Sequence, residues 1–463
     1  MLIRITKSTT PDPYGNPEAG QVLAKKAMPD IGLPPDLAQS LIRDELMLDG
    51  NARQNLATFC QTWMEPNVHK IMDECIDKNM IDKDEYPATA ELENRCVHML
   101  ADLWNSPEAA DTVGCSTTGS SEAAMLGGLA LKFSWRNKRL KEGKDVSKPN
   151  IVTGPVQVCW HKFARYLDVE LREVPIKHDR LGLDGQVIRD YVDENTIGVV
   201  PTFGVTFTCH YEPVEEICQS LDNLQKDKGL DIPVHVDAAS GGFISPFVEP
   251  DIKWDFRLPR VVSINASGHK YGLAPLGVGW VVWRDKKHLP EDLIFWVNYL
   301  GGNMPTFALN FSRPGGQIVA QYYLLNRLGR EGYRQIMNNL YLSAERINKG
   351  IDAFQDFEIF FDGSQKKGIP AVSWTLKPEV KNYSLYDLSD RLRMRGWQVS
   401  AYSMLPDIQE TVVMRVVLRH GFSVDMASLF LEDVQRCLDY FKKHPVSVPQ
   451  SSGEVNVFDH TGR

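Results

Sequence analysis

The feature that most constrains this chain is a succession of short apolar segments, several of which end at a polar residue. Segments at 150–153, 169–174, 197–206, 232–237 and 261–264 are rich in aliphatic residues and alternate with helical patterns. Such runs are typical of buried strands. Strands that alternate with helices predict a mostly parallel sheet with helices on both faces. Because ligands of such sheets lie at the carboxyl ends of the strands, we expect a functional site at that edge.

Four polar side chains fall at or just after predicted strand ends: His161, Thr206, Asp237 and Lys270. Lysine is almost never buried without a partner. Lys270 is therefore either at an exposed loop tip or a Schiff-base lysine. In a Schiff-base lysine, burial and neighbouring cations lower the pKa of the amine from about 10.4. A Ser-x-x-Lys pair also occurs in serine acyl-transfer enzymes, but no Lys-Thr-Gly follows here. Four polar residues at one edge of the sheet favour one shared site over four unrelated polar positions.

Small and hydroxyl residues at 114–121 run directly into a helical pattern. The free N–H groups and the dipole at a helix N-terminus attract phosphate, and Ser120 and Ser121 add hydroxyl donors. An ordinary serine N-cap with Glu122 in the first turn fits the same residues. Together with Asp237 and Lys270, however, these are the parts that hold pyridoxal 5'-phosphate. The lysine forms an imine, the aspartate pairs with the pyridine nitrogen, and the helix binds the phosphate.

The 463 residues are enough for two or three domains. We expect an N-terminal arm and helix (1–53), a large cofactor-binding domain (54–340) and a small α+β domain with a flexible tail (341–463).

The net charge of −9 argues against nucleic acid as the main partner. Since no apolar run could span a bilayer and no signal peptide is recognisable, we expect no membrane segment and a cytoplasmic location. Eight cysteines without a Cys-x-x-Cys pair argue against a disulfide framework and a metal site.

The remaining secondary structure follows from periodicity. Helical patterns are expected at 35–69, 72–81, 92–104, 214–226 and 317–352, and a loop at the basic segment 136–148. In the small domain we expect strands at 358–361, 371–376, 397–401 and 412–418, and helices at 385–394 and 426–443.

Beyond these parts, six segments carry a resemblance to a known family: 51–63, 119–123, 160–166, 235–243, 267–270 and 311–317. They resemble the bacterial and plant glutamate decarboxylases, which are pyridoxal-phosphate-dependent group II decarboxylases, and the similarity covers about residues 40 to 440. It implies an α/β fold of the aspartate-aminotransferase-like class (fold type I), with a mostly parallel seven-stranded sheet and a smaller α+β C-terminal domain. It also implies pyridoxal 5'-phosphate as cofactor, L-glutamate as substrate, and 4-aminobutyrate and CO2 as products. The implied assembly is a homodimer at minimum, with a hexamer of three dimers as the larger form.

The resemblance implies a role for each matching residue. Lys270, Asp237 and His161 are the implied catalytic residues, with His161 stacked on the cofactor ring. The implied cofactor-binding set adds Ser120, Ser121, Gln157, Thr206, Ser267, His269 and, from a second subunit, Ser312. The implied substrate-binding residues are Thr58, Phe59, Asn79, Asp82 and Arg415.

Arg415 is implied to hold the substrate α-carboxylate, although Arg419 is expected nearby on the same strand and could do the same. The other four substrate-binding residues are implied to face the distal carboxylate, partly from the neighbouring subunit. Asp82 would then need to share a proton with that carboxylate, which predicts stronger binding at acid pH. Without the family, Asp82 would be an ordinary helix-end carboxylate.

The tail carries one further prediction. Bacterial members end in a histidine-threonine pair that closes the active site at neutral pH, and His460 and Thr461 match it, although two more residues follow. A histidine side chain ordinarily titrates near 6.5, and only its neutral form is a nucleophile. Phe458 could anchor the tail at the site. The alternative is a disordered end with an idle histidine.

Two other functions remain open at this point. One is a decarboxylase for aspartate or an aromatic amino acid, which the proposed distal-carboxylate pocket disfavours. The other is a catalytically silent scaffold without cofactor, which the presence of both Lys270 and Asp237 disfavours.

Overall fold

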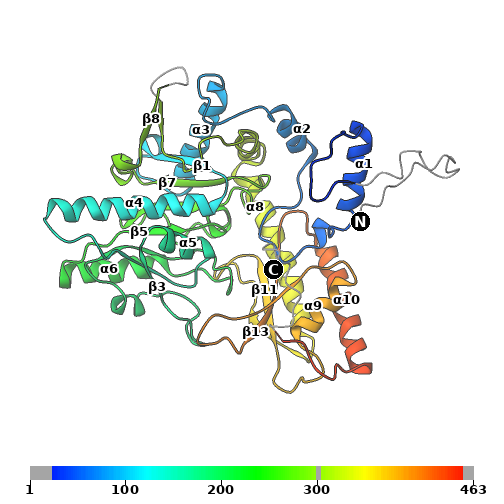
Figure 1. The fold of residues 1–463 in the computed structure, drawn as a ribbon. Helices are drawn as coiled ribbons and strands as arrows, with labels where there is room; N and C mark the ends of the chain where they lie inside the picture. Colours follow the sequence, from blue (N-terminus) through cyan, green and yellow to red (C-terminus); the bar gives the residue numbers. More distant parts are fainter. Residues whose placement is uncertain (1–22, 299–303, 452–463) are drawn as a thin grey trace.

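The fold is described by a computed structural model that covers residues 23–298 and 304–451 (Figure 1). The predictions for the first 22 residues, and those for Phe458 and His460, concern residues outside these ranges. Within them, a large α/β unit and a smaller α+β unit lie side by side, and helix α8 connects them.

The large unit is built on a seven-stranded sheet in the order β1-β7-β6-β5-β4-β2-β3. Its strands are β1 (Val113–Thr117), β2 (Asn150–Thr153), β3 (Glu170–Glu173), β4 (Thr196–Val200), β5 (Val234–Asp237), β6 (Val261–Ala266) and β7 (Gly279–Trp283). Only β7 runs antiparallel to its neighbours, β1 and β6, so the predicted mostly parallel seven-stranded sheet is confirmed. β1 was not predicted as a strand, because glycine, cysteine and serine interrupt its β-branched pattern.

Helices cover the sheet on both faces, as predicted. They include α3 (Pro87–Leu103), α4 (Ser120–Lys141), α5 (Val158–Tyr166), α6 (Val214–Lys228) and α7 (Ser245–Val248). The loop expected at 136–148 is wrong for its first six residues, which continue α4. Their positive side chains favour the negative end of the helix dipole, and Arg139 donates to the backbone oxygens of Asp145 and Glu194.

The N-terminal helices are shorter than predicted. The pattern at 35–69 forms two helices, α1 (Pro35–Leu46) and α2 (Pro66–Glu74), and the one expected at 72–81 ends at Glu74. The segment between α1 and α2 is held instead by the small unit. Leu56 N donates to Gln398 O at 2.8 Å, and Arg419 donates to Cys60 O at 2.9 Å.

The small unit has a four-stranded antiparallel sheet in the order β10-β11-β13-β12. Its elements are β10 (Phe357–Phe361), β11 (Ala371–Leu376), α9 (Leu385–Arg393), β12 (Ser400–Ser403), β13 (Val412–Val417) and α10 (Val424–Lys443). β12 starts three residues later than expected. A short pair, β8 (Phe295–Val297) and β9 (Met304–Thr306), projects from the large unit.

Helix α8 (Gly316–Asp352) bends at Gly329, whose φ of 57° suits glycine. It packs against α2 and α3 as well as β10, β11 and α10, so the division proposed at residue 340 would fall inside it. A buried core runs through both units and includes Trp104, Trp280 and Trp374.

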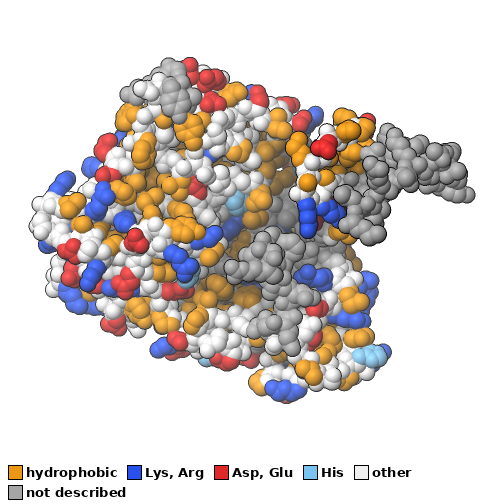
Figure 2. Space-filling view, viewed as in Figure 1, with side chains coloured by type: hydrophobic (Ala, Val, Ile, Leu, Met, Phe, Trp, Pro, Cys, Tyr) orange, Lys and Arg blue, Asp and Glu red, His pale blue; other side chains and the backbone are white. Residues whose placement is uncertain are grey.

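On the visible face, acidic and basic side chains are interspersed (Figure 2). Among the described residues no helix is both long enough and apolar enough to span a membrane.

Candidate active site

A polar cradle forms where the N-terminus of α4 meets the loop after β6. Ser267 Oγ donates to Ser120 Oγ at 2.7 Å, and no side chain of the described residues caps the helix at Gly119. His269 is buried against Gly119, and its Nδ1 lies 3.3 Å from the backbone nitrogen of Val278. Burial is the main reason why its pKa falls to about 4, so the ring is neutral at neutral pH. Uncapped helix N–H groups with two hydroxyls fit a phosphate.

The cradle depends on a close approach of β7 to α4. A Cβ atom at Gly279 would lie 2.5 Å from the backbone nitrogen of Ser120. Glycine is therefore required here for the strand to pass so near the helix N-terminus. Ser121 also lies in the first turn of α4, with an exposed side chain.

Lys270 lies in the same loop, and its side chain points at the segment before α2. Its Nζ is 5.2 Å from the centre of the Phe59 ring, and Gln61 N donates to His269 O at 2.7 Å. Burial is the largest cause of a lowered pKa of Lys270, and Asp237 opposes it. A neutral amine, which is the nucleophilic form, is therefore more accessible than in an exposed lysine.

Asp237 ends β5 and is buried, with 4% of its surface exposed. Its Oδ2 accepts from Trp160 Nε1 at 2.9 Å. Its Oδ1 accepts from Asn265 Nδ2 at 3.0 Å and from Ala239 N at 3.1 Å. Three N–H donors thus hold a buried carboxylate in one orientation, which fits a partner for a protonated pyridine nitrogen.

Arg415 of β13 reaches the same place from the small unit. Its guanidinium carbon is 4.7 Å from the Phe59 ring centre and 5.2 Å from that of Tyr402. It donates to the backbone oxygens of Thr206 and Ala57, and its buried Nε has no hydrogen-bond partner in the described chain. Because Phe59 touches both cations, the structure brings Lys270, Phe59, Thr206 and Arg415 together.

Arg419 is not on the same strand as Arg415, because β13 ends at Val417. It donates to Cys60 O at 2.9 Å, to Thr62 Oγ1 at 2.6 Å and to Asn55 O. Its guanidinium is therefore occupied in holding the segment that carries Thr58 and Phe59. Thr58 Oγ1 accepts from Cys60 N at 3.2 Å within that segment.

Two predicted site residues, one on α5 and one immediately before it, make contacts that the sequence did not predict. Gln157 is the N-cap, and its Oε1 accepts from Cys159 N at 2.7 Å. His161 Nε2 lies 3.3 Å from Glu173 Oε2, and 48% of the His161 side chain stays exposed. Neither residue is hydrogen-bonded to Asp237 or Lys270 across residues 23–298 and 304–451. Their proposed contacts with the cofactor ring therefore remain predictions.

The other three predicted residues form a second cluster. Asn79 Nδ2 donates to Ser312 Oγ at 3.4 Å, and Asn79 Oδ1 accepts from Arg313 N at 3.1 Å. Asp82 follows in the same turn, where its N–H donates to Asn79 O at 3.2 Å. No hydrogen bond or ion pair in the described ranges joins this cluster to Lys270, Asp237 or Arg415.

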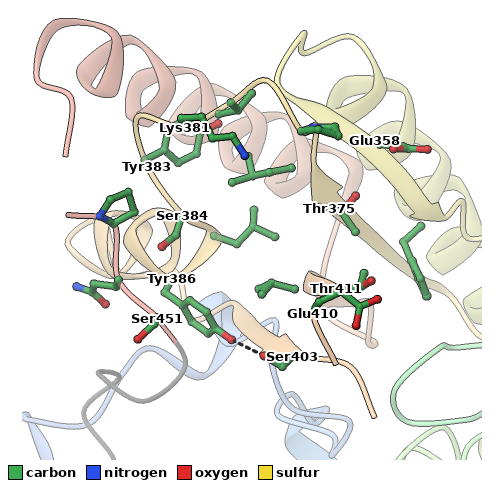
Figure 3. Close-up of a pocket in the computed structure, with 18 of the residues that line it drawn as sticks. Glu358, Thr375, Lys381, Tyr383, Ser384, Tyr386, Ser403, Glu410, Thr411 and Ser451 are labelled. Carbon is green, nitrogen blue, oxygen red and sulfur yellow. Dashed lines mark hydrogen bonds between the residues drawn. The ribbon is translucent and has the colours of Figure 1, made fainter. Parts of the chain in front are cut away.

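A cavity of about 790 Å³ lies elsewhere, in the small unit (Figure 3). β11, the start of α9 and residues 449–451 line it, and the hydroxyls of Tyr386 and Ser403 lie 3.3 Å apart at its wall. It contains none of the predicted site residues. We assign the candidate site instead to Lys270, Asp237, Phe59, Thr206 and Arg415, here called the Lys270 group. This group combines a lysine of lowered pKa with a buried carboxylate and a buried guanidinium.

Sequence reasoning missed three contributors. Trp160 and Asn265 hold Asp237, and Arg313 supports Ser312 by donating to Ser116 O and Ser116 Oγ, both at 2.6 Å. Each stands one or two positions from a predicted residue. Their neighbourhood was therefore visible in the sequence, but their hydrogen-bond partners were not.

Comparison with known proteins identifies the family. The model of the pyridoxal-dependent decarboxylase conserved domain matches residues 30–377. The chain belongs to the pyridoxal-dependent decarboxylase family. It is 62% identical to a glutamate decarboxylase of Aliivibrio fischeri over 97% of both chains. It is 49% identical to glutamate decarboxylase 1 of Arabidopsis thaliana, over 94% of this chain and 88% of that one.

Among solved structures, glutamate decarboxylase of Lactobacillus brevis superposes with a TM-score of 0.89 at 43% identity, covering 92% of this chain and 97% of that one. The predicted fold type I architecture is confirmed. The cofactor of this pyridoxal-dependent decarboxylase is pyridoxal 5'-phosphate. The residues present fit it, because an uncapped helix N-terminus, a buried carboxylate and a lysine of lowered pKa converge on one place.

Proposed function

We propose that this decarboxylase removes the α-carboxylate of L-glutamate, giving 4-aminobutyrate and CO2 and consuming one proton. The observation that carries the proposal is that Lys270 and the buried Arg415 both lie over the Phe59 ring, while the charge of Asp237 acts on Lys270. The choice of glutamate is supported by the 62% identity, over almost the entire length, to a protein named glutamate decarboxylase.

Bound pyridoxal 5'-phosphate supplies an electron sink for the pair released when the Cα–carboxylate bond breaks. The side chains bind and orient. Ser120, Ser267 and the α4 N-terminus hold the phosphate, and Asp237 faces the pyridine nitrogen. Arg415, a buried cation without a carboxylate partner in the described chain, holds the substrate α-carboxylate through its guanidinium. A proton then replaces CO2 at Cα.

The test is product analysis over a pH series. The purified protein, supplied with cofactor, is expected to convert L-glutamate to 4-aminobutyrate, with higher activity at acid than at neutral pH. The acid preference follows if Asp82 must share a proton with the distal carboxylate. L-aspartate and L-tryptophan serve as comparison substrates. Release of CO2 from one of these, and none from glutamate, would overturn the proposed substrate.

We further propose that the cluster of Asn79, Asp82 and Ser312 completes the site of a second copy of the chain. Hydrogen bonds place Ser312 beside the turn that carries Asp82. Arg313 and the buried Glu93, 3.5 Å apart, fix the base of the cluster. The cluster of Asn79, Asp82 and Ser312 is thus held by Arg313, and in the described residues it has no hydrogen bond to the Lys270 group. This is expected of a cluster that serves a partner subunit.

Mixing two inactive variants tests this arrangement. Lys270→Ala and Asp82→Ala dimers should each be nearly inactive, whereas exchanged subunits should regain about a quarter of wild-type activity. Random mixing makes half of the dimers hybrids, and one of the two sites in each is then intact. Mixing Lys270→Ala with Lys270→Ala/Asp82→Ala chains is the matched control and should regain nothing. Absence of any regain after verified exchange would show that each chain builds its own site.

We also propose that the tail inhibits the enzyme at neutral pH through His460. The support is chemical, since an ordinary imidazole becomes a neutral nucleophile between acid and neutral pH. Deletion of residues 455–463, or His460→Ala, is expected to extend activity toward neutral pH and to preserve the visible absorbance of bound cofactor there. His444→Ala, which removes an exposed histidine closer to α10, is the control. If both tail variants keep the wild-type pH profile and spectrum, the tail has no such role.

A further inference from the structure

We infer that Asn265 is a positioning residue that orients the Asp237 carboxylate, and that His235 in turn fixes the orientation of Asn265. The inference rests on the proposed role of Asp237 as partner of the cofactor's pyridine nitrogen. It is carried by a row of buried side chains on two neighbouring parallel strands. The strand register pairs His235 with Ser263 and Asp237 with Asn265, so all four side chains lie on one face of the sheet.

The row is closed to solvent. His235, Ser263 and Asn265 have no exposed surface, and neither has Trp160, which approaches from α5. Buried polar groups are costly unless they are hydrogen-bonded. Every member of this row is hydrogen-bonded, which makes it a fully connected network between β5, β6 and α5.

The two ends of the Asn265 amide have different partners. Nδ2 donates to Asp237 Oδ1 at 3.0 Å, and Oδ1 lies 2.7 Å from His235 Nε2. Turning the amide over would place its oxygen against a carboxylate oxygen with no hydrogen between them. Only one of the two orientations of the Asn265 amide is therefore compatible with Asp237. That orientation requires a hydrogen-bond donor at His235 Nε2.

His235 can be that donor because its other nitrogen is satisfied. His235 Nδ1 lies 2.7 Å from Ser263 Oγ, so it accepts from the hydroxyl while Nε2 carries the proton. Burial lowers the pKa of His235 to about 4, and the ring is neutral at neutral pH. All hydrogens in the row consequently point toward Asp237: from Ser263 to His235, from His235 to Asn265, and from Asn265 to the carboxylate.

Packing prevents the imidazole from turning away. A Cβ atom at Gly127 of α4 would lie 2.6 Å from His235 Nδ1, so the helix that begins at the phosphate cradle presses directly on the ring. The Trp160 ring meets it edge-on at 5.4 Å. The same tryptophan donates to the second oxygen of Asp237, and both oxygens are thereby held.

Two variants of similar size test the role. Asn265→Leu removes the donor and is expected to lower kcat for glutamate about tenfold or more, with KM changed less than about threefold. Asn265→Asp places an acceptor there and should lose at least as much at neutral pH. It should recover relative to wild type at acid pH, where the new carboxyl group is protonated and can donate. The ionisable groups hydrogen-bonded to position 265 are Asp237 and His235.

The matched control is Thr153→Val on β2 of the same sheet, which removes a buried hydroxyl without a hydrogen-bond partner in the described chain. It should leave both kcat and the pH profile unchanged. A second readout is independent of turnover: the 15N chemical shift of cofactor labelled at the pyridine nitrogen. In Asn265→Leu this signal should move toward the unprotonated position, and in Thr153→Val it should not.

Wild-type kcat and wild-type 15N shift in both folded Asn265 variants would overturn the inference. If Asn265→Leu does not fold, Asn265→Asp alone decides, because an acid recovery is not expected of a merely structural side chain. A wild-type protein without activity on glutamate would overturn the proposed function instead. The 15N comparison would still decide the role of Asn265.

Discussion

Lys270→Ala is expected to abolish nearly all decarboxylation and the covalent retention of pyridoxal 5'-phosphate. Lys270 supplies the nucleophilic amine of the site, and burial lowers its pKa so that this amine is available. The measurements are 4-aminobutyrate formation and visible absorbance after desalting. We expect a loss of several powers of ten in rate, with unchanged circular dichroism.

Lys253→Ala is a suitable control, because Lys253 is exposed and pairs with Glu215 at 2.9 Å. It should keep wild-type activity and cofactor retention. If Lys270→Ala turned over glutamate normally, Lys270 would have no part in the mechanism.

The same substitution has a consequence for stability without cofactor. The folded pKa of Lys270 lies below its ordinary value of 10.5, so the unfolded chain binds this proton more tightly. The resulting destabilisation is fully present below the folded pKa, and it disappears as pH rises toward 10.5. Lys270→Ala should remove this dependence, so the free energy of unfolding of the variant apoprotein should rise less than that of wild-type apoprotein as pH rises from neutral toward 10.5. Chemical unfolding at several pH values measures it.

Asp237→Asn is expected to lower the rate by several powers of ten, and saturating cofactor should not restore it. The negative charge opposite the pyridine nitrogen is lost, and with it the protonated ring that accepts electrons. In addition, one side of the new amide would present N–H to the donors Trp160 or Asn265. Cofactor titration separates the two effects, because a defect of affinity alone would disappear at saturation.

Asp433→Asn is the matched control. Asp433 is also buried, and it also accepts from a tryptophan, Trp397 Nε1, at 2.9 Å. Its replacement should lower the melting temperature and leave kcat unchanged. If Asp433→Asn reduced kcat as strongly as Asp237→Asn, the loss at Asp237 would reflect folding and not the electronic role of its charge.

Local patterns in the chain were sufficient for much of the fold. Apolar runs that end at polar residues predicted β2, β5 and β6 and placed Asp237 and Lys270 at strand ends. They failed where a local pattern competed with distant contacts. Segment 47–65 has a helical pattern, but hydrogen bonds from Gln398 and Arg419 hold it between α1 and α2. The basic end of α4 looked like a loop, but its charges suit the helix terminus.

The sequence by itself determined which residue types could carry the chemistry, because a lysine and an aspartate at buried strand ends have few other uses. Only the tertiary structure separated Arg415 from Arg419, four positions apart. The Arg415 guanidinium lies 4.7 Å from the centre of the Phe59 ring, which Lys270 also approaches. The Arg419 guanidinium instead donates to Cys60 O, Thr62 Oγ1 and Asn55 O, and these hydrogen bonds hold the segment that carries Phe59. Likewise, the register of β5 against β6 placed Asn265 beside Asp237. Hydrogen-bond partners depend on which strands become neighbours, and that is decided by packing across the entire chain.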